Sequence, residues 1–380
     1  MLPLIAWFFK ILNPAYVPKN GKGQGATGRS DTITQAKNST VQEGKPAAKF
    51  AQLAKSAKSA FSTQGNKAVP EYAGDYKALP SYIDATYFDW VAGKEEDNVI
   101  KEDAFERKII EYLDVVAESE HAGSNLIPRV PTVMVQLLKR MHEENVSGAE
   151  LSRIITKDVV LLAAILNEVN SSFYNKSEKI TELSQAILLL GHNRLRMVLA
   201  KLSFTPIFNA QLGPYTKVTA AKIWEESQKR ALVCYLLAKI QQVDPFMAFL
   251  AGLMQDVGLM VALRVFDRSS GNAALPTSSE FRRAFQQKSL VLSTRIGQIW
   301  ALPDVVIKAI ESQGPDKTAP VRAPLASVLD RADLLSKICI LINQEQINLD
   351  MERVRVILTD AETDCLFTML EGQVSVATIM

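Results

Sequence analysis

The chain has 380 residues, of which 47% are hydrophobic, enough to bury the cores of two or three domain-sized units. Its 43 Lys and Arg against 41 Asp and Glu give a formal net charge of +2, which excludes a uniformly basic nucleic-acid-binding protein and an acidic disordered chain. The charge is segregated, because residues 19–70 hold nine basic and two acidic residues and residues 71–380 carry a net charge of −6. The sequence therefore predicts a basic arm followed by a mildly acidic globular part.

Residues 1–13 form a short apolar segment that carries one charge, Lys10. The segment is shorter than the roughly 20 apolar residues of a spanning helix, and it lacks the basic start and the cleavage site of a secretory signal. We expect a helix that lies in a membrane interface. The residues expected to contact the membrane are Leu4, Ile5, Trp7, Phe8, Phe9 and Lys10. The alternative is a segment that docks on the protein's own core.

Residues 14–70 are rich in Gly, Ser, Thr, Gln and Lys and poor in aliphatic residues. Such a segment cannot bury enough apolar surface to offset its ordering entropy, so it is predicted to be a disordered basic linker. Its positive charge would add to the attraction of residues 1–13 for an anionic membrane surface. No specific nucleic-acid binding is expected, because aromatic residues that could stack on bases are not interleaved with the basic ones.

From Tyr72 onward, apolar residues recur at helical spacing, and alternation over the length of a strand is hard to find. This pattern predicts an all-α fold. Asp158 and Asp244 are expected to cap helix starts, Gly191 to end a helix, and Pro324 to open a long amphipathic helix.

The chain has three cysteines, Cys234, Cys339 and Cys365, each within an apolar helical pattern. Their odd number and wide spacing predict buried free thiols of a protein from a reducing cytoplasm.

Five strings follow one another along residues 126–310. They are LIPRVPTVMVQLLKRM (126–141), GAELSRIITKDVVLLAAILNEVNSSFY (148–174), ITELSQAILLLG (180–191), AGLMQDVGLM (251–260) and WALPDVVIKAI (300–310). In this order they resemble the HDOD domain, the HD-related output domain of bacterial signalling proteins. The resemblance covers residues 119–320 and implies an N-terminal helical bundle followed by an HD-like helical bundle. Residues 71–118 and 321–380 are expected to be helical extensions on either side.

Active HD phosphohydrolases bind metal through a histidine, an adjacent His-Asp pair and a later Asp. The resemblance places the histidine at Glu226, the His-Asp pair at Gln255 and Asp256, and a later histidine position at about Ser289. The last histidine of the chain is His192, so the HD-like half contains none. We therefore expect a degenerate site with no catalytic residue, no metal and no cofactor. A site built from the carboxylates of Glu226 and Asp256 alone remains as the alternative.

Together these features predict a non-catalytic signal-transduction or scaffold protein. Its HDOD domain would bind a protein partner of a regulatory pathway, or a ligand. The protein is expected in the cytoplasm, held peripherally at the inner membrane by residues 1–70. The alternative function is that of a residual HD-type metal-dependent phosphohydrolase.

Overall fold

A computed structural model describes residues 69–93, 103–118, 148–170, 179–209, 213–269, 275–276, 278–314 and 322–370. The chain divides into two units, residues 1–68 and 69–380, and the described residues all belong to the second. The predicted membrane-contact residues and the linker up to residue 68 therefore lie outside the described residues. The first of the five sequence motifs, residues 126–141, also lies outside them.

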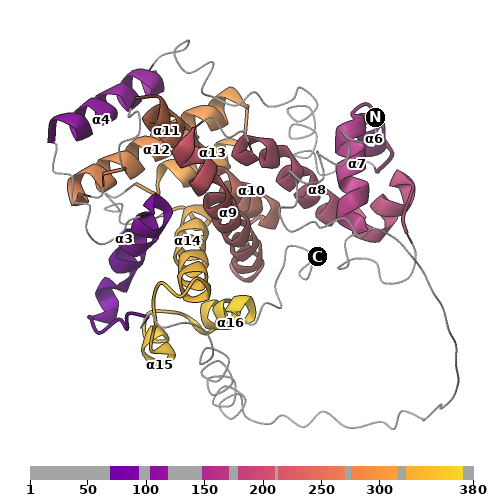
Figure 1. Cartoon of the computed structure of the whole chain (residues 1–380). Helices are drawn as coiled ribbons and strands as arrows, with labels where there is room; N and C mark the ends of the chain where they lie inside the picture. The colour runs from indigo at the N-terminus through magenta and orange to yellow at the C-terminus, as the bar shows by residue number, and fades with distance from the viewer. Residues whose placement is uncertain are drawn as a thin grey trace, which may run out of the picture. The chain divides into compact units, whose positions relative to one another are not determined.

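The described part of the chain is built from helices (Figure 1). They are the short 3-10 helix η1 (Tyr76–Ala78) and the α-helices α3 (Leu79–Ala92), α4 (Asp103–Glu118), α6 (Gly148–Ile155), α7 (Val159–Val169), α8 (Leu183–Asn209), α9 (Pro214–Ile240), α10 (Pro245–Met254), α11 (Val257–Ser269), α12 (Ser279–Ile299), α13 (Asp304–Glu311), α14 (Pro324–Asn343), α15 (Met351–Val354) and α16 (Asp360–Leu370). The extended backbone in these ranges pairs at an isolated bridge between Glu71 and Asn348. The predicted all-α class is confirmed.

The helix starts follow the predicted capping residues. The Asp158 carboxylate accepts from the backbone N–H groups of Val160 and Leu161, both at 3.0 Å. The Asp244 carboxylate accepts from Phe246 N at 2.8 Å, and a proline follows it in the first turn of α10. These bonds satisfy donors that the first turn of a helix leaves unpaired. Pro324 likewise stands at the start of α14.

Gly191 ends the first helical segment of α8, as predicted, and a second segment follows it directly. Helical structure continues to Asn209, with a kink at Gly191 where φ is 68° and ψ is 176°. A left-handed φ of this kind suits glycine because it has no Cβ. The residue therefore breaks the helix direction as expected, but a second helical segment begins at once and no loop intervenes.

Helix α9 is central to the packing of the HD-like half. It packs against α10, α14, α11, α8 and α3, while α12 packs against α11, α4 and α13. Figure 1 shows α3 beside α14, and α14 beside α9. The two helices α3 and α14 come from the predicted extensions, so both extensions cover the HD-like half.

Within the described residues, Pro245–Ser269 is long and apolar enough to cross a membrane, with a mean hydropathy of 1.8. This stretch comprises α10 and α11. In its most apolar 18-residue segment, 83% of the residues are buried inside the fold. Such burial is typical of the core helices of a folded domain.

The three cysteines are free and buried, as predicted. Burial raises the pKa of Cys339 to about 11 and that of Cys365 to about 12, and it raises the pKa of the Cys234 thiol as well. The thiolate is the reactive form of cysteine, and a raised pKa keeps these thiols protonated. The three side chains therefore act as packing groups.

Candidate functional site

The four degenerate HD positions lie on three neighbouring parts of the fold. Glu226 is on α9, Gln255 and Asp256 form the short connection between α10 and α11, and Ser289 is on α12. Glu226 is fully buried, and Gln255 and Ser289 are also buried. The structure brings the first three together around a residue that the sequence reasoning did not single out, Arg230.

The Arg230 guanidinium lies among three carboxylates. It donates to Glu226 Oε1 at 3.0 Å, to Asp256 Oδ2 at 2.6 Å and to Asp333 Oδ1 at 2.8 Å. Its Nε also donates to the carbonyl oxygen of Gly252 at 3.1 Å. Arg230 is 0% exposed, so these charge-assisted bonds replace its hydration entirely.

A second cation, Lys337 of α14, extends this cluster to α3. Its ammonium lies 2.6 Å from Asp333 Oδ2 and 2.7 Å from Asp84 Oδ1. Gln255 Nε2 donates to Asp333 Oδ1 at 2.8 Å, and the Ser336 hydroxyl donates to Glu226 Oε1 at 2.8 Å. The result is one polar network that joins α3, α9, α14 and the connection between α10 and α11.

Helix periodicity explains half of this geometry. Glu226 and Arg230 are four residues apart on α9, and Asp333 and Lys337 are four apart on α14, so each pair lies on one helix face. Close packing of α10 on α9 supplies the rest. A Cβ at Gly252 would stand 2.5 Å from Ala231 Cα, so glycine is what lets the α10 backbone approach Arg230.

Ser289 has a different environment from the other three positions. Its hydroxyl donates to the carbonyl oxygen of Phe285 at 2.7 Å, one turn earlier on α12. Its own carbonyl oxygen faces Gly258 of α11, where a Cβ would come within 1.9 Å of it. Nearby, the Ser293 hydroxyl accepts from Gly258 N at 2.8 Å and donates to the carbonyl oxygen of Gln255 at 2.6 Å. Ser289 therefore belongs to the α11–α12 contact.

The charges of the network set its protonation states. Burial disfavours ionisation of Asp333, but Lys337 and Arg230 outweigh it and hold the pKa of this carboxyl at about 2. Burial raises the pKa of Glu226 well above its usual range, with Arg230 opposing the shift and Asp256 adding to it. Burial lowers the pKa of Arg230, but Asp256 and Glu226 reverse that effect and raise it. Arg230 and Asp333 thus stay ionised at neutral pH.

These residues do not fit the metal ion of an active HD site. A metal needs imidazole nitrogens or carboxylate oxygens that converge on it with free lone pairs, within about 2.0–2.6 Å. Here Glu226, Asp256 and Asp333 converge on a guanidinium, whose positive charge repels a metal ion. Among the residues that the structure describes, no group of three or more His, Cys, Asp or Glu has the arrangement of a metal site.

A hollow of about 160 Å³ opens beside the Arg230 network. The network residues Gln255, Asp256, Asp333 and Lys337 form one side of it, and Ser289 also lines it. Helix α3 contributes Asp84, Tyr87, Phe88 and Val91 to its lining. The degenerate HD positions Gln255, Asp256 and Ser289 thus share one hollow, and a helix from the N-terminal extension forms part of its wall.

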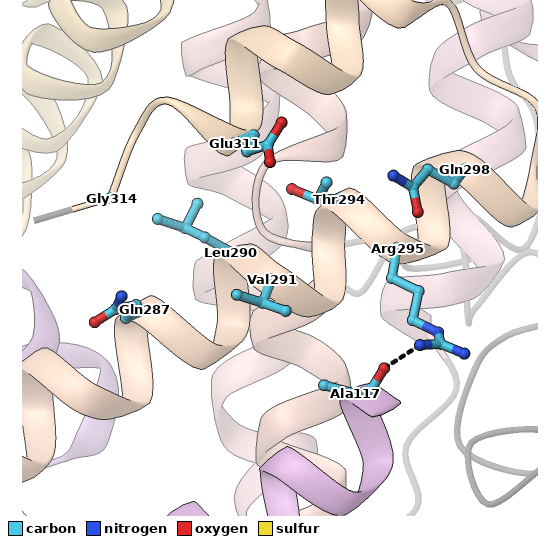
Figure 2. A pocket seen from close by; sticks show the side chains of 9 residues that line it. All are labelled: Ala117, Gln287, Leu290, Val291, Thr294, Arg295, Gln298, Glu311 and Gly314. Carbon is cyan, nitrogen blue, oxygen red and sulfur yellow. Dashed lines mark hydrogen bonds between the residues drawn. The ribbon is translucent and has the colours of Figure 1, made fainter. Parts of the chain in front are cut away.

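A second hollow, of about 320 Å³, is lined by residues of α4, α12 and α13 (Figure 2). Figure 2 shows Arg295 turned toward Ala117, whose carbonyl oxygen accepts a hydrogen bond from the guanidinium. One arginine and one glutamate, Glu311, are the charged residues of this lining. None of the sequence-predicted site residues lines it, so the Arg230 network is the better candidate for the functional site.

The sequence reasoning missed Arg230, Asp333, Lys337 and Asp84. A signal for the first three was present, because Glu226–Arg230 and Asp333–Lys337 are opposite charges at a spacing of four. What the spacing could not reveal is that the two pairs face each other, because Arg230 and Asp333 are 103 residues apart.

Comparison with known proteins places this geometry in a family. Residues 127–314 match the HDOD domain model. Over 119 residues the chain is 33% identical to YuxH of Bacillus subtilis (strain 168), an uncharacterised protein, and this match covers 31% of the chain and 28% of YuxH.

Two solved structures are similar to this chain to different degrees. An HDOD domain protein of unknown function from Geobacter sulfurreducens matches with a TM-score of 0.51 and 16% identity, over 72% of this chain and 91% of that one. A Shewanella amazonensis SB2B protein with a provisional assignment as a metal-dependent phosphohydrolase matches with a TM-score of 0.46 and 14% identity, over 70% and 99% of the two chains. The described helices, the matched residues 127–314 and the Geobacter fold agree: the chain contains an HDOD domain at residues 127–314.

Proposed function

We propose that this protein is a non-catalytic signal-transduction or scaffold protein whose HDOD domain binds a regulatory partner protein or a ligand. The observation that carries this proposal is the position of Arg230. HDOD proteins are related to HD phosphohydrolases, whose chemistry depends on a metal ion. In this chain the carboxylates at the corresponding place are bonded to an internal guanidinium.

The energetics of that arrangement disfavour its replacement by a metal. Arg230 is covalently part of α9, and its three carboxylate partners come from three separate segments of the chain. A metal ion would have to expel a cation that cannot leave the protein, and the expelled guanidinium would then be buried without a partner, at a cost of several kcal/mol. A site of this kind is suited to holding helices in place and to recognition.

We expect the purified full-length protein to bind no stoichiometric Mn²⁺ in calorimetric titration. We also expect it to hydrolyse bis-p-nitrophenyl phosphate with added Mn²⁺ no faster than with EDTA. Asp256→Ala is the informative variant. Glu225→Gln, at the half-buried residue next to Glu226, is the control. One bound metal per chain, together with hydrolysis that Asp256→Ala abolishes and Glu225→Gln retains, would establish the alternative phosphohydrolase.

We further propose that residues 1–70 hold the protein at the cytoplasmic face of the inner membrane. The support is the sequence pattern of an apolar segment rich in aromatic residues followed by a basic stretch. Each basic residue near an anionic surface contributes at most about 1 kcal/mol, and salt weakens that attraction. Stable attachment therefore requires the apolar and basic signals together.

Vesicle sedimentation tests the tether. Full-length protein should sediment with vesicles that contain about 30% anionic lipid, and the bound fraction should fall as salt is raised. Removal of residues 1–68 should abolish binding, and it leaves the Pro70 carbonyl in place to accept from Asn348 N at 2.9 Å. Serine at Trp7, Phe8 and Phe9 together should weaken binding in the otherwise intact chain. Equal sedimentation of all three proteins would show that the tether does not exist.

A further inference from the structure

The hollow beside the Arg230 network has features of a binding site. Its volume is about 160 Å³, similar to the roughly 150 Å³ engineered cavity that accommodates benzene. That space suits an occupant of about six to nine non-hydrogen atoms. Three parts of the lining indicate what kind of occupant fits.

Two buried polar atoms at the hollow lack a hydrogen-bond partner. Tyr87 Oη and Gln255 Oε1 are both buried and unbonded in the described structure, and both side chains line the hollow. The residues are only 5% and 7% exposed, so bulk water does not solvate them freely. A buried polar group left unbonded costs about 1–3 kcal/mol, which an occupant with hydrogen-bond donors would recover. Gln255 Oε1 can only accept, so the occupant must donate to it.

Acidic groups outnumber basic groups around the hollow. The lining contains four aspartates, Asp84, Asp256, Asp330 and Asp333, against two cations, Arg283 and Lys337. From outside the lining, Arg322 pairs with Asp330 at 3.3 Å. Behind the wall, Arg230 pairs with Asp256 at 2.6 Å and with Asp333 at 2.8 Å. Two cations, Arg230 and Lys337, are thus shared by three carboxylates, Asp84, Asp256 and Asp333. The carboxylate in excess favours an occupant with a single positive charge.

The lining also has an apolar part. Phe88 and Val91 of α3 line it together with Leu259 and Leu263 of α11. The Tyr87 ring already attracts a cation, because Lys337 Nζ lies 5.5 Å from its centroid. A long polyamine would place charge against the leucines, and a neutral hydrocarbon would leave the carboxylates and Gln255 without a donor. The lining therefore matches a compact apolar body with one cationic donor group.

We propose that this hollow binds a small primary amine that has a compact apolar body. Its ammonium group donates to Gln255 Oε1 and to the facing aspartates, and its apolar body contacts Phe88 and the α11 leucines. This assignment rests on the proposed non-catalytic function and names the chemical class of the ligand. It also makes α3, from outside the matched HDOD residues, part of the recognition surface.

The test uses the full-length protein and three probes of one shape. Phenethylamine carries the ammonium, 2-phenylethanol replaces it with a hydroxyl, and phenylacetate replaces it with a carboxylate. Calorimetric titration and thermal unfolding should show saturable binding of phenethylamine and a rise in Tm. 2-Phenylethanol should bind at least tenfold more weakly, and phenylacetate should not bind.

Two tyrosines of α3 supply a matched pair of variants. Tyr87→Phe removes the unbonded hydroxyl but keeps the ring, so the fold should be at least as stable, and the affinity for phenethylamine should fall several-fold. Tyr82→Phe removes a hydroxyl from a half-buried tyrosine outside the lining, and it should leave affinity unchanged. Asp84→Asn should weaken phenethylamine at least tenfold and 2-phenylethanol little.

Three results would overturn the assignment. They are no saturable binding of phenethylamine up to about 10 mM, equal affinity for the amine and the alcohol, and equal affinity of the Tyr87→Phe and Tyr82→Phe proteins. If any of these results is found and the protein also fails to bind Mn²⁺, the amine proposal is refuted while the proposed non-catalytic function is retained. Metal-dependent hydrolysis would instead remove the proposed function itself, whatever the probes do.

Discussion

Arg230→Met should lower the free energy of unfolding by about 3–5 kcal/mol, because it removes the guanidinium of a buried charge network and leaves Glu226 and Asp256 without their cation. Methionine has a similar length, so the loss reports charge more than volume. Three carboxylates, Glu226, Asp256 and Asp333, would then lie in the interior without Arg230. Urea denaturation, read from the midpoint at constant slope, measures the change.

The neighbouring residue gives the control. Lys229 pairs with Glu225 at 3.6 Å, also four residues apart on α9, but both side chains are solvent-exposed in part. Lys229→Met should therefore cost at most about 0.5 kcal/mol. Adding Asp256→Asn to Arg230→Met should restore part of the lost stability, because it removes one of the unpaired charges. A loss for Arg230→Met no larger than that for Lys229→Met would refute the assigned role of the guanidinium.

Gly258→Ala should be the second strongly destabilising change, with an expected net cost of about 2–4 kcal/mol. A Cβ at this position would lie 1.9 Å from Ser289 O and 2.5 Å from Ser293 N, both backbone atoms. Helices α11 and α12 would have to separate, which stretches the 2.8 Å bond from Gly258 N to Ser293 Oγ. Overpacking of this kind outweighs the preference of a helix for alanine, which is about 1 kcal/mol at most.

Thermal and urea unfolding of Gly258→Ala should be compared with Gly314→Ala. Among the described residues, no atom lies within 4 Å of a Cβ at Gly314, and the φ of Gly314 is not in the left-handed region. Gly314→Ala should therefore change stability by less than about 0.5 kcal/mol. If the two variants unfold alike, the α11–α12 contact is looser than the structure indicates.

Local chemistry made much of the fold predictable. Helical spacing of apolar residues specifies the all-α class, and Asp158 and Asp244 cap the helices that they were expected to open. The structure after Gly191 was harder to predict. A left-handed glycine indicates that the backbone changes direction, but it does not indicate whether a loop or another helix follows. Only tertiary packing makes a second helical segment continue from it.

The candidate site was less predictable, for a physical reason. The family resemblance located Glu226, Gln255 and Asp256, three positions that the structure brings together. It placed Ser289 with them, but this residue takes part in the α11–α12 contact. Arg230 has no counterpart among the expected ligands, and its partner Asp333 lies beyond residue 320, where the resemblance stopped. Arg230 and Asp333 come together because α14 packs on α9. The spacing of residues within either helix does not predict that packing.

The partners of Arg230 and Lys337 also define the cooperative folding unit. Asp84, Asp333 and Lys337 all lie outside residues 127–314, so a fragment cut to the homologous segment would keep the Arg230 guanidinium and discard one of its three counter-ions. It would also strip α14 from the buried face of α9. We therefore expect the smallest cooperative folding unit to include both α3 and α14.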